Sequence, residues 1–432
     1  MKAVDLFAAM VLLGSAVEAA AAGFVLGVGT HAGIGRDQAA AIESRLAEAP
    51  ADAIRDDLLW SRVERRPGRF ERSAEVRELD ALIDSSRRQG REVVLILAYG
   101  NRAVGVHGLP RSADERAAFL RYVRWAVEQY KDRVRYFEVW NEWNTGMGAG
   151  AGKSHGSAAA YLALLKEVYP AIKALAPEAV VLGGAVSGTD TDWVQAFLDA
   201  GGPDHLDALS LHPYVHAKGR AGLPERVIGW LDQVRAQLAS RPAWRDKPIF
   251  ITEIGWPSSV SPQGVSASRV ADFVVRFLSL ARARADWIHG VWWYELIDGG
   301  RRPEKNGHNF GLFDRAGGSK PALAAIAKMR ALITRFDDWH ELDVGPDARL
   351  VIASNPSPPA SCAVLWSVHG AHPAFLLFAA GGDIQWQPAT ATDAGPVDGK
   401  WQVAARETPQ IWCAERGLIE AVPVRPLGRP DA

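Results

Sequence analysis

The stretch VRYFEVWN, residues 134–141, is an apolar, β-prone run that ends in polar residues and precedes a long amphipathic pattern at 157–176. A short strand followed by a longer helix is typical of βα units around a parallel sheet. Eight such strands are predicted: Phe24–His31, Ala53–Asp56, Glu92–Ala98, Val134–Asn141, Ala179–Gly184, Leu206–His212, Pro248–Glu253 and Ile288–Tyr294. Eight strands, each followed by a helix, predict a closed α/β fold, the (β/α)8 TIM barrel, rather than an open doubly wound sheet.

The chain on either side of the predicted barrel has a different character. Residues 1–22 place Lys2 before a short apolar run and then small residues, which predicts a signal peptide and a periplasmic or secreted protein. A nonspecific mobile N-terminus is the alternative. The barrel is expected at 23–338. From 339 to 432, β-prone pieces between Pro, Gly and Asp clusters predict a small β-sandwich domain, with strands at 349–353, 363–367, 374–379 and 400–403.

Charge and cysteine content narrow the possible partners and the compartment. The formal net charge of -1 gives no overall field for nucleic acid or an anionic membrane, so a neutral substrate fits better. The sixteen Trp residues can stack on sugar rings or fill a core. Cys362 and Cys413 are the only cysteines, and either a disulfide or two buried free thiols is compatible with the sequence.

Two predicted strands end in a glutamate among tryptophans: Glu142 after the fourth strand and Glu253 at the end of the seventh. In a barrel, these strand ends form the active site, and strands four and seven lie across its mouth from each other. Glycoside cleavage with retention requires two carboxyl groups roughly 5 Å apart. Aromatic walls around Glu142 suit a general acid/base, which leaves Glu253 as the nucleophile. For a single glutamate, a solvated residue or a helix start would be the alternative.

Two further polar residues fit this chemistry. Arg55, at the end of the second strand, is expected to donate to Glu253 and keep it ionised, and a surface or interstrand ion pair is the alternative. Asn141 is expected to donate its amide to the 2-hydroxyl of the sugar, a contact that strengthens in the transition state.

These motifs resemble a known group of enzymes. The Trp-Asn-Glu motif at 140–142, together with Thr-Glu-Ile-Gly-Trp at 252–256, is similar to clan A of the glycoside hydrolases. Within that clan the chain resembles glycoside hydrolase family 39 and the PslG-type bacterial exopolysaccharide hydrolases, over roughly residues 23–333. The resemblance implies that Glu142 is the acid/base and Glu253 the nucleophile.

The resemblance also implies roles at other strand ends. A His or Tyr near the nucleophile corresponds to His212 and Tyr214, although a structural His that caps the strand is an alternative. The clan often places a Trp under the cleaved sugar at strand eight. Since strand alternation turns only one of Trp292 and Trp293 inward, Trp293 is predicted to be that floor. Four other residues near strand ends are predicted to contact substrate, with core packing as the alternative: Trp143, Trp256, His31 and Trp60.

Other active-site types find little support. The loop at 146–154 ends like a phosphate-binding loop, but Met147 stands where that motif requires Gly, so a mobile loop beside the substrate is expected. No metal site and no cofactor are expected, because the remaining candidate ligands lack metal-ligand spacing: His107, His155, His216 and His308. No Gly-x-Ser-x-Gly motif indicates a serine hydrolase.

The sequence therefore predicts a monomeric retaining β-glycosidase that binds a polysaccharide or oligosaccharide and no nucleic acid. Tryptophans at several strand ends could line multiple subsites, which favours endo action on an exported bacterial exopolysaccharide, in biofilm or related carbohydrate metabolism. Association with a polysaccharide export machinery is a further expectation. The alternatives are a noncatalytic polysaccharide-binding protein of the same fold and an exo-acting, β-xylosidase-like enzyme.

Overall fold

The computed structural model describes residues 23–149, 155–370, 373–379, 384–386 and 401–424. The predicted signal peptide and part of the loop at 146–154 lie outside these residues. Within the described part, none of the helices is both long enough and apolar enough to cross a membrane.

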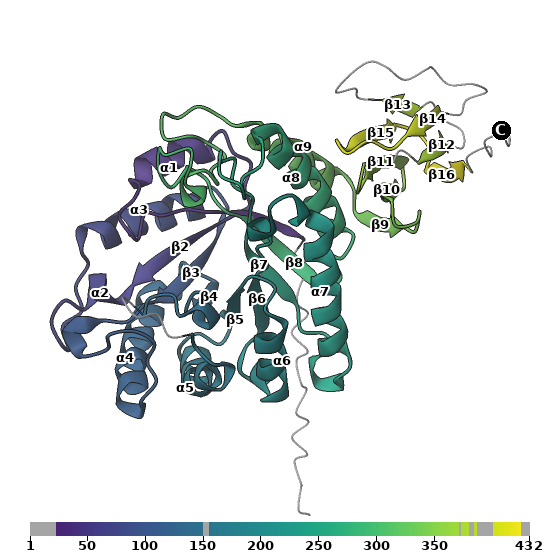
Figure 1. Cartoon of the computed structure of the whole chain (residues 1–432). Helices are drawn as coiled ribbons and strands as arrows, with labels where there is room; N and C mark the ends of the chain where they lie inside the picture. Colours follow the sequence, from purple (N-terminus) through teal and green to yellow (C-terminus); the bar gives the residue numbers. More distant parts are fainter. Residues whose placement is uncertain (1–22, 150–154, 371–372, 380–383, 387–400, 425–432) are drawn as a thin grey trace, which may run out of the picture.

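Eight parallel strands form a closed barrel in chain order, which confirms the predicted TIM barrel (Figure 1). The strands are β1 (Val25–Gly29), β2 (Ala53–Leu59), β3 (Glu92–Ala98), β4 (Tyr136–Val139), β5 (Val180–Ser187), β6 (Ala208–His212), β7 (Ile249–Ile254) and β8 (Ile288–Trp293). β2 runs on to Leu59, beyond the predicted end at Asp56, and both Asp56 and Asp57 are buried within it. β4 ends earlier than predicted, since Trp140 has a φ of 67°.

Helices surround the barrel and alternate with its strands. They are α1 (Ala39–Leu46), α2 (Trp60–Val63), α3 (Ala74–Arg88), α4 (Ala113–Tyr130), α5 (Ala158–Leu175), α6 (Thr191–Asp199), α7 (Pro224–Ala239), α8 (Ala267–Arg282) and α9 (Pro321–Arg335). Several begin where a serine accepts a hydrogen bond from the first turn, and Ser112 and Glu115 form a capping box at α4. These caps fix where the long connecting helices start.

The barrel interior is layered from bottom to mouth. An apolar layer closes the end from which the strands start, and it includes Ala53, Val94, Tyr136, Leu182, Ala208, Phe250 and Trp292. Two residues further along their strands, the inward positions are polar, as at Arg55, Glu138 and Thr252. The apolar layer therefore acts as a floor beneath a buried polar layer, and the site is built on top of it.

A bulge in β7 shapes the polar layer. Ile251 pairs with Val291 and Ile254 pairs with Trp293, so β7 carries one extra residue over this interval. The irregularity lets consecutive residues, Thr252 and Glu253, both reach partners inside the barrel. In a regular strand their side chains would point to opposite faces.

The C-terminal part is a β-sandwich of a five-stranded and a three-stranded sheet, also as predicted. Its strands are β9 (Asp338–Leu342), β10 (Ala348–Pro356), β11 (Pro359–Ser367), β12 (Ala374–Ala379), β13 (Ile384–Trp386), β14 (Trp401–Ala404), β15 (Gln410–Ala414) and β16 (Ile419–Val424). Cys362 on β11 and Cys413 on β15 form a disulfide between paired strands. The disulfide alternative left open by the sequence is thus the one adopted.

The sandwich packs against the barrel helices α7 and α8. Trp366 is fully buried and donates its indole N–H to Glu225 Oε1 at 2.7 Å. Glu225 also accepts two hydrogen bonds from Arg276, at 2.8 and 2.6 Å. An ion pair between Arg269 and Glu407 adds to the contact. One buried carboxylate thus joins both parts of the chain.

Candidate active site

The ends of the barrel strands surround a cavity of about 630 Å³ that contains both predicted carboxylates. Its lining includes His31, Arg36, Arg55, Asp57, Tyr99, Asn141, Glu142, Tyr214, His216, Glu253, Tyr294 and Phe310. Larger hollows of about 740 and 960 Å³ lie at the start of β3 to β5 and beside the sandwich. Neither of them contains Glu142 or Glu253, so the cavity at the barrel mouth is the candidate site.

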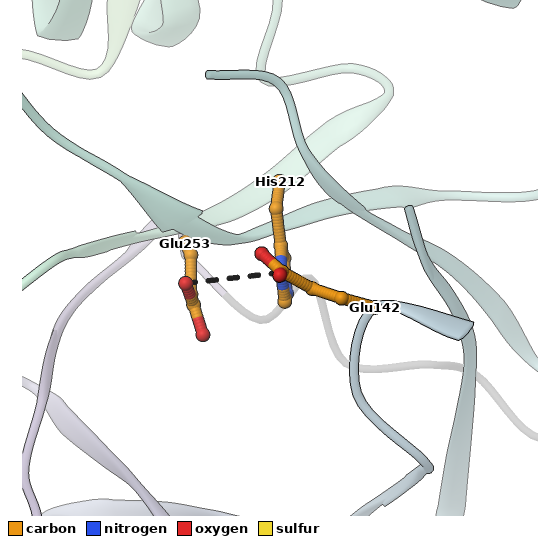
Figure 2. A group of neighbouring side chains, drawn as sticks. All are labelled: Glu142, His212 and Glu253. Carbon is orange, nitrogen blue, oxygen red and sulfur yellow. Dashed lines mark hydrogen bonds and ion pairs between the residues drawn. The ribbon is translucent and has the colours of Figure 1, made fainter. Parts of the chain in front are cut away.

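Glu142 and Glu253 face each other across this cavity, with His212 between them (Figure 2). One oxygen of each carboxyl group and one ring nitrogen of His212 all lie within 4.8 Å of one another. Glu142 follows β4 with a φ of 48°, and this left-handed backbone turns its side chain back over the barrel. This approach is compatible with the spacing of about 5 Å between the two carboxyl groups of retaining glycosidases.

Glu253 is held by donors on both of its oxygens. Arg55 Nη1 donates to Oε1 at 2.5 Å, and the Tyr214 hydroxyl donates to Oε2 at 2.8 Å. Burial alone would raise the pKa of Glu253, but His212, Arg55 and the hydrogen bond from Tyr214 together hold that pKa below its ordinary value. These neighbours therefore favour the ionised form of Glu253.

Arg55 is anchored by a residue that the sequence analysis missed. Its Nε donates to Glu138 Oε2 at 2.6 Å, and both side chains are buried. Burial opposes the charge on Arg55, but Glu138 and Glu253 outweigh it and raise the pKa of the guanidinium above its ordinary value. The available signal was a glutamate within the apolar run of the fourth strand, at a position that alternation turns inward.

Arg55 also sets the orientation of Asn141. Its Nη2 donates to Asn141 Oδ1 at 2.8 Å, so the amide nitrogen must face the other way. That nitrogen donates one hydrogen to the Tyr99 hydroxyl at 3.0 Å. Its second hydrogen is left for a ligand in the cavity, and the predicted contact with a sugar 2-hydroxyl stays a prediction.

A hydrogen-bond chain connects Glu138 through Thr252 to His212. Thr252 donates its single hydroxyl hydrogen to Glu138 Oε1 at 2.7 Å, because an ionised carboxylate has none to give. The 2.9 Å contact between Thr252 Oγ1 and His212 Nε2 is then satisfied by a hydrogen on Nε2, while Arg55 Nη2, which can only donate, lies 3.3 Å from the same nitrogen. In the neutral ring, Nδ1 accepts, and it lies 3.3 Å from Glu142 Oε1.

Aromatic side chains in the cavity differ from those predicted. Trp293 is wrong as the inward residue of strand eight: its side chain packs against Trp256 in the wall, while Trp292 belongs to the apolar floor. Tyr294, one residue later, lines the cavity instead. Alternation predicts which side chains of strand eight point into the barrel, but not how far each lies from the cavity. Trp292 points inward at the level of the apolar floor, below the cavity.

Three more tryptophans predicted to contact substrate are also buried away from the cavity. Trp143 packs against Trp140 and Tyr161, Trp256 donates to the Gly222 carbonyl, and Trp60 stacks on Tyr122. The packing alternative therefore holds for Trp143, Trp256 and Trp60. The cavity takes its aromatic surface from tyrosine and phenylalanine: Tyr99, Tyr214, Tyr294 and Phe310.

His31 does line the cavity, as predicted, and it stands in a second charged group. Its Nε2 lies 2.8 Å from Glu295 Oε2, and Arg36 donates to the same oxygen. Burial raises the pKa of Glu295 to about 7, against the opposing effect of Arg36. The sequence analysis missed Glu295 and Arg36, which meet only because β8 closes on β1.

Among the described residues, Glu142, His212 and Glu253 form the one group with the geometry to hold a metal ion. Both oxygens of Glu253 already accept hydrogen bonds, and the Arg55 cation lies against the same carboxylate. This environment suits a nucleophile and a proton donor better than metal ligation.

A closed parallel barrel with a facing carboxylate pair at its strand ends is the arrangement of the barrel glycosidases. In agreement, the family model described as glycosyl hydrolase catalytic core matches residues 118–325. A search of curated proteins finds no significant match to the chain.

Solved structures of glycoside hydrolases are similar in fold. A family 39 glycoside hydrolase from the gut symbiont Bacteroides cellulosilyticus WH2 has a TM-score of 0.72 at 22% identity, over 91% of this chain and 81% of that one. A monomeric β-xylosidase from Caulobacter crescentus CB15 has a TM-score of 0.60 at 17% identity, over 92% and 96%. A GH5_18 protein from Streptomyces cattleya has a TM-score of 0.58 at 18% identity, over 72% and 80%. Together with the matched catalytic core, this shared fold confirms the resemblance to clan A glycoside hydrolases.

Proposed function

We propose that this protein is a retaining β-glycosidase in which Glu142 is the general acid/base and Glu253 the nucleophile. The observation that carries the proposal is the approach of the two carboxyl groups, whose nearest oxygens lie within 4.8 Å, inside a cavity at the barrel mouth. A sugar ring placed there would have its anomeric carbon between the two side chains.

In the first step, Glu253 attacks the anomeric carbon as Glu142 gives its proton to the departing glycosidic oxygen. The Glu253 carboxylate becomes an ester with the sugar, and the aglycone leaves as an alcohol. Arg55 and Tyr214 hold the attacking group and steady its charge before the bond forms. Asn141 supplies its remaining amide hydrogen to the sugar.

In the second step, Glu142, now ionised, takes a proton from water as the water oxygen attacks the anomeric carbon. The ester breaks, Glu253 returns as a carboxylate, and the product keeps the β configuration. His212, fixed by Thr252, stays within hydrogen-bond reach of Glu142 in both steps.

The mode of cleavage is a separate part of the proposal. Endo action on an exported polysaccharide was predicted from tryptophans at the strand ends, but those tryptophans pack in the barrel wall. This observation favours the second candidate, an exo-acting enzyme or one that cleaves short oligosaccharides. Export, monomeric state and association with an export machinery remain proposals that follow from the sequence.

Kinetics with aryl β-glycosides and NMR of the product anomer test the mechanism. Glu253→Gln is expected to abolish hydrolysis and keep glycan binding. Glu142→Ala is expected to slow it at least a hundredfold, with partial rescue by azide. Glu178→Gln, at an exposed site before β5 at the opposite end of the barrel, is the matched control and is expected to behave as wild type. Full activity of Glu253→Gln, or an α product, would contradict the assignment.

Product analysis against β-linked polysaccharides and oligosaccharides decides the mode of cleavage. Monosaccharide release is expected from exo action, and a ladder of oligosaccharides from endo action. Binding of a polysaccharide without any cleavage would instead support the noncatalytic alternative.

A further inference from the structure

Asp57 is a buried carboxyl group in the cavity that the mechanism above does not use. It lies two residues beyond Arg55 on β2, so strand alternation turns it inward one layer nearer the mouth. It lines the cavity and is only 7% exposed. Among the described residues, no donor makes a hydrogen bond to its carboxyl group.

The neighbouring Asp56, by contrast, is a carboxylate with a structural role. Asp56 accepts hydrogen bonds from the Thr30 hydroxyl and from the backbone N–H groups of Ala32, Gly33 and Asp57, at 2.7 to 2.9 Å. These donors tie the loop after β1 to β2. Asp57 has no comparable task, because its side chain joins no two parts of the chain.

Burial of a carboxylate is costly, and Asp57, which has no hydrogen-bond donor among the described residues, can accept hydrogen bonds from a ligand in the cavity. Burial and the nearby Asp56 raise the pKa of Asp57 to about 7, although Arg55 opposes this effect. A ligand that donates hydrogen bonds would relieve the cost when it enters. Asp57 therefore offers a hydrogen-bond acceptor in the cavity wall to a ligand that carries hydroxyl groups.

The cations of the cavity are already paired with carboxylates. Arg55 binds Glu138 and Glu253, and Arg36 binds Glu295. Within the described part of the chain, no arginine or lysine of the cavity lining is left to receive an anionic group. The surplus charge at the site is negative, and Asp57 contributes to it.

We propose that Asp57 is the specificity-determining residue of the sugar subsite, where its carboxylate accepts hydrogen bonds from ring hydroxyls of an uncharged sugar and excludes uronic acids. The inference rests on the proposed glycosidase function and adds the substrate class. A sugar with vicinal hydroxyls can satisfy both carboxylate oxygens at once, whereas a uronate would bring a second negative charge into a buried site.

The test compares wild type, Asp57→Asn and Asp57→Ala on p-nitrophenyl β-xyloside, β-glucoside, β-glucuronide and β-glucosaminide. Wild type is expected to prefer an uncharged glycone to the glucuronide by at least about a hundredfold. Asp57→Asn is expected to lower kcat/KM for the uncharged glycone about tenfold to a hundredfold. The ratio of kcat/KM between the uncharged glycoside and the glucuronide is expected to fall at least tenfold. Asp246→Asn, at an exposed site before β7, is the matched control.

Deoxygenated substrates identify the hydroxyl that Asp57 binds. Removal of that hydroxyl is expected to slow wild type and to have little further effect on Asp57→Ala, because the partner is already missing. Two results would overturn the inference. One is an unchanged ranking of glycones in both variants, and the other is an equal loss of rate from every deoxy position in wild type and Asp57→Ala.

Binding of the free sugars separates this inference from the proposed function. If wild type cleaves none of the glycosides, the glycosidase proposal fails, and calorimetry with xylose, glucose and glucuronate still tests Asp57. Binding of the neutral sugars by wild type and at least tenfold weaker binding by Asp57→Asn would support its role. Equal binding by wild type and Asp57→Asn would overturn it.

Discussion

Replacing Glu138 with Gln should reverse the hydrogen-bond chain that leads to the general acid. Arg55 Nε needs an acceptor, so the Gln oxygen must face Arg55 and the amide nitrogen must face Thr252. Thr252 then accepts and turns its own hydrogen toward His212 Nε2. The ring proton moves to Nδ1, which points at Glu142.

The size of the effect follows from the groups involved. An N–H that donates to a carboxylate contributes about 1.5–3 kcal/mol, and each pH unit corresponds to about 1.4 kcal/mol. The donor favours the ionised form of Glu142, so the acid should lose its proton at a pH lower by about one to two units. Loss of the buried charge should also cost about 3 kcal/mol of the free energy of unfolding.

The assay is the pH dependence of kcat/KM for two aryl glycosides, one with a good leaving group and one with a poor leaving group. The alkaline limb should move to lower pH with the poor leaving group, which needs protonation, and the rate ratio between the two substrates should widen. Thr252→Val cuts the chain without reversing it and should shift the limb less. An alkaline limb of Glu138→Gln at the wild-type pH, in a folded protein, would refute the reasoning.

Three other outcomes can be measured directly. Tyr214→Phe removes a hydrogen bond that lowers the pKa of Glu253, so the acidic limb of kcat/KM should move to higher pH by up to about one unit, and an unmoved limb would contradict this. Asp57→Asn should raise the free energy of unfolding by about 2–4 kcal/mol above pH 7. The same substitution should not raise the free energy of unfolding below about pH 4, because Asp57 is then protonated in both the folded and the unfolded protein. The reason is that the pKa of Asp57 is higher in the folded protein than in the unfolded one. Equal increases at both pH values in denaturant melts would exclude this explanation. Replacement of Cys362 and Cys413 by Ser opens a link across 51 positions and should cost about 4 kcal/mol in denaturant unfolding, whereas an unchanged midpoint would show that the bridge adds nothing.

The barrel could be predicted from sequence because each of its strands is buried on both faces. Such strands appear as continuous apolar runs, and β3 was predicted with its observed bounds of Glu92–Ala98. Closure of eight strands then brings the polar ends together. Glu142 and Glu253 could therefore be placed opposite each other without any knowledge of side-chain packing.

Other features of the site could not be predicted from the alternation of inward and outward side chains along a strand. The bulge in β7 turns Glu253 inward beside Thr252, and nothing in the local sequence marks it. The height of each inward residue within the barrel decided between Trp293 and Tyr294. Arg36 and Glu295 are 259 positions apart, and only the closure of the barrel brings them into contact.

The buried contact between Trp366 and Glu225 bears on how the two parts of the chain depend on each other. The sandwich rests on α7 and α8, the helices that precede and follow β7, and β7 carries Glu253. It therefore supports the strand of Glu253 from behind, although the described residues of the sandwich add no side chain to the cavity lining. Removing residues after 338 would strip the packing from one side of the barrel, so the topological boundary is no safe place to shorten this enzyme.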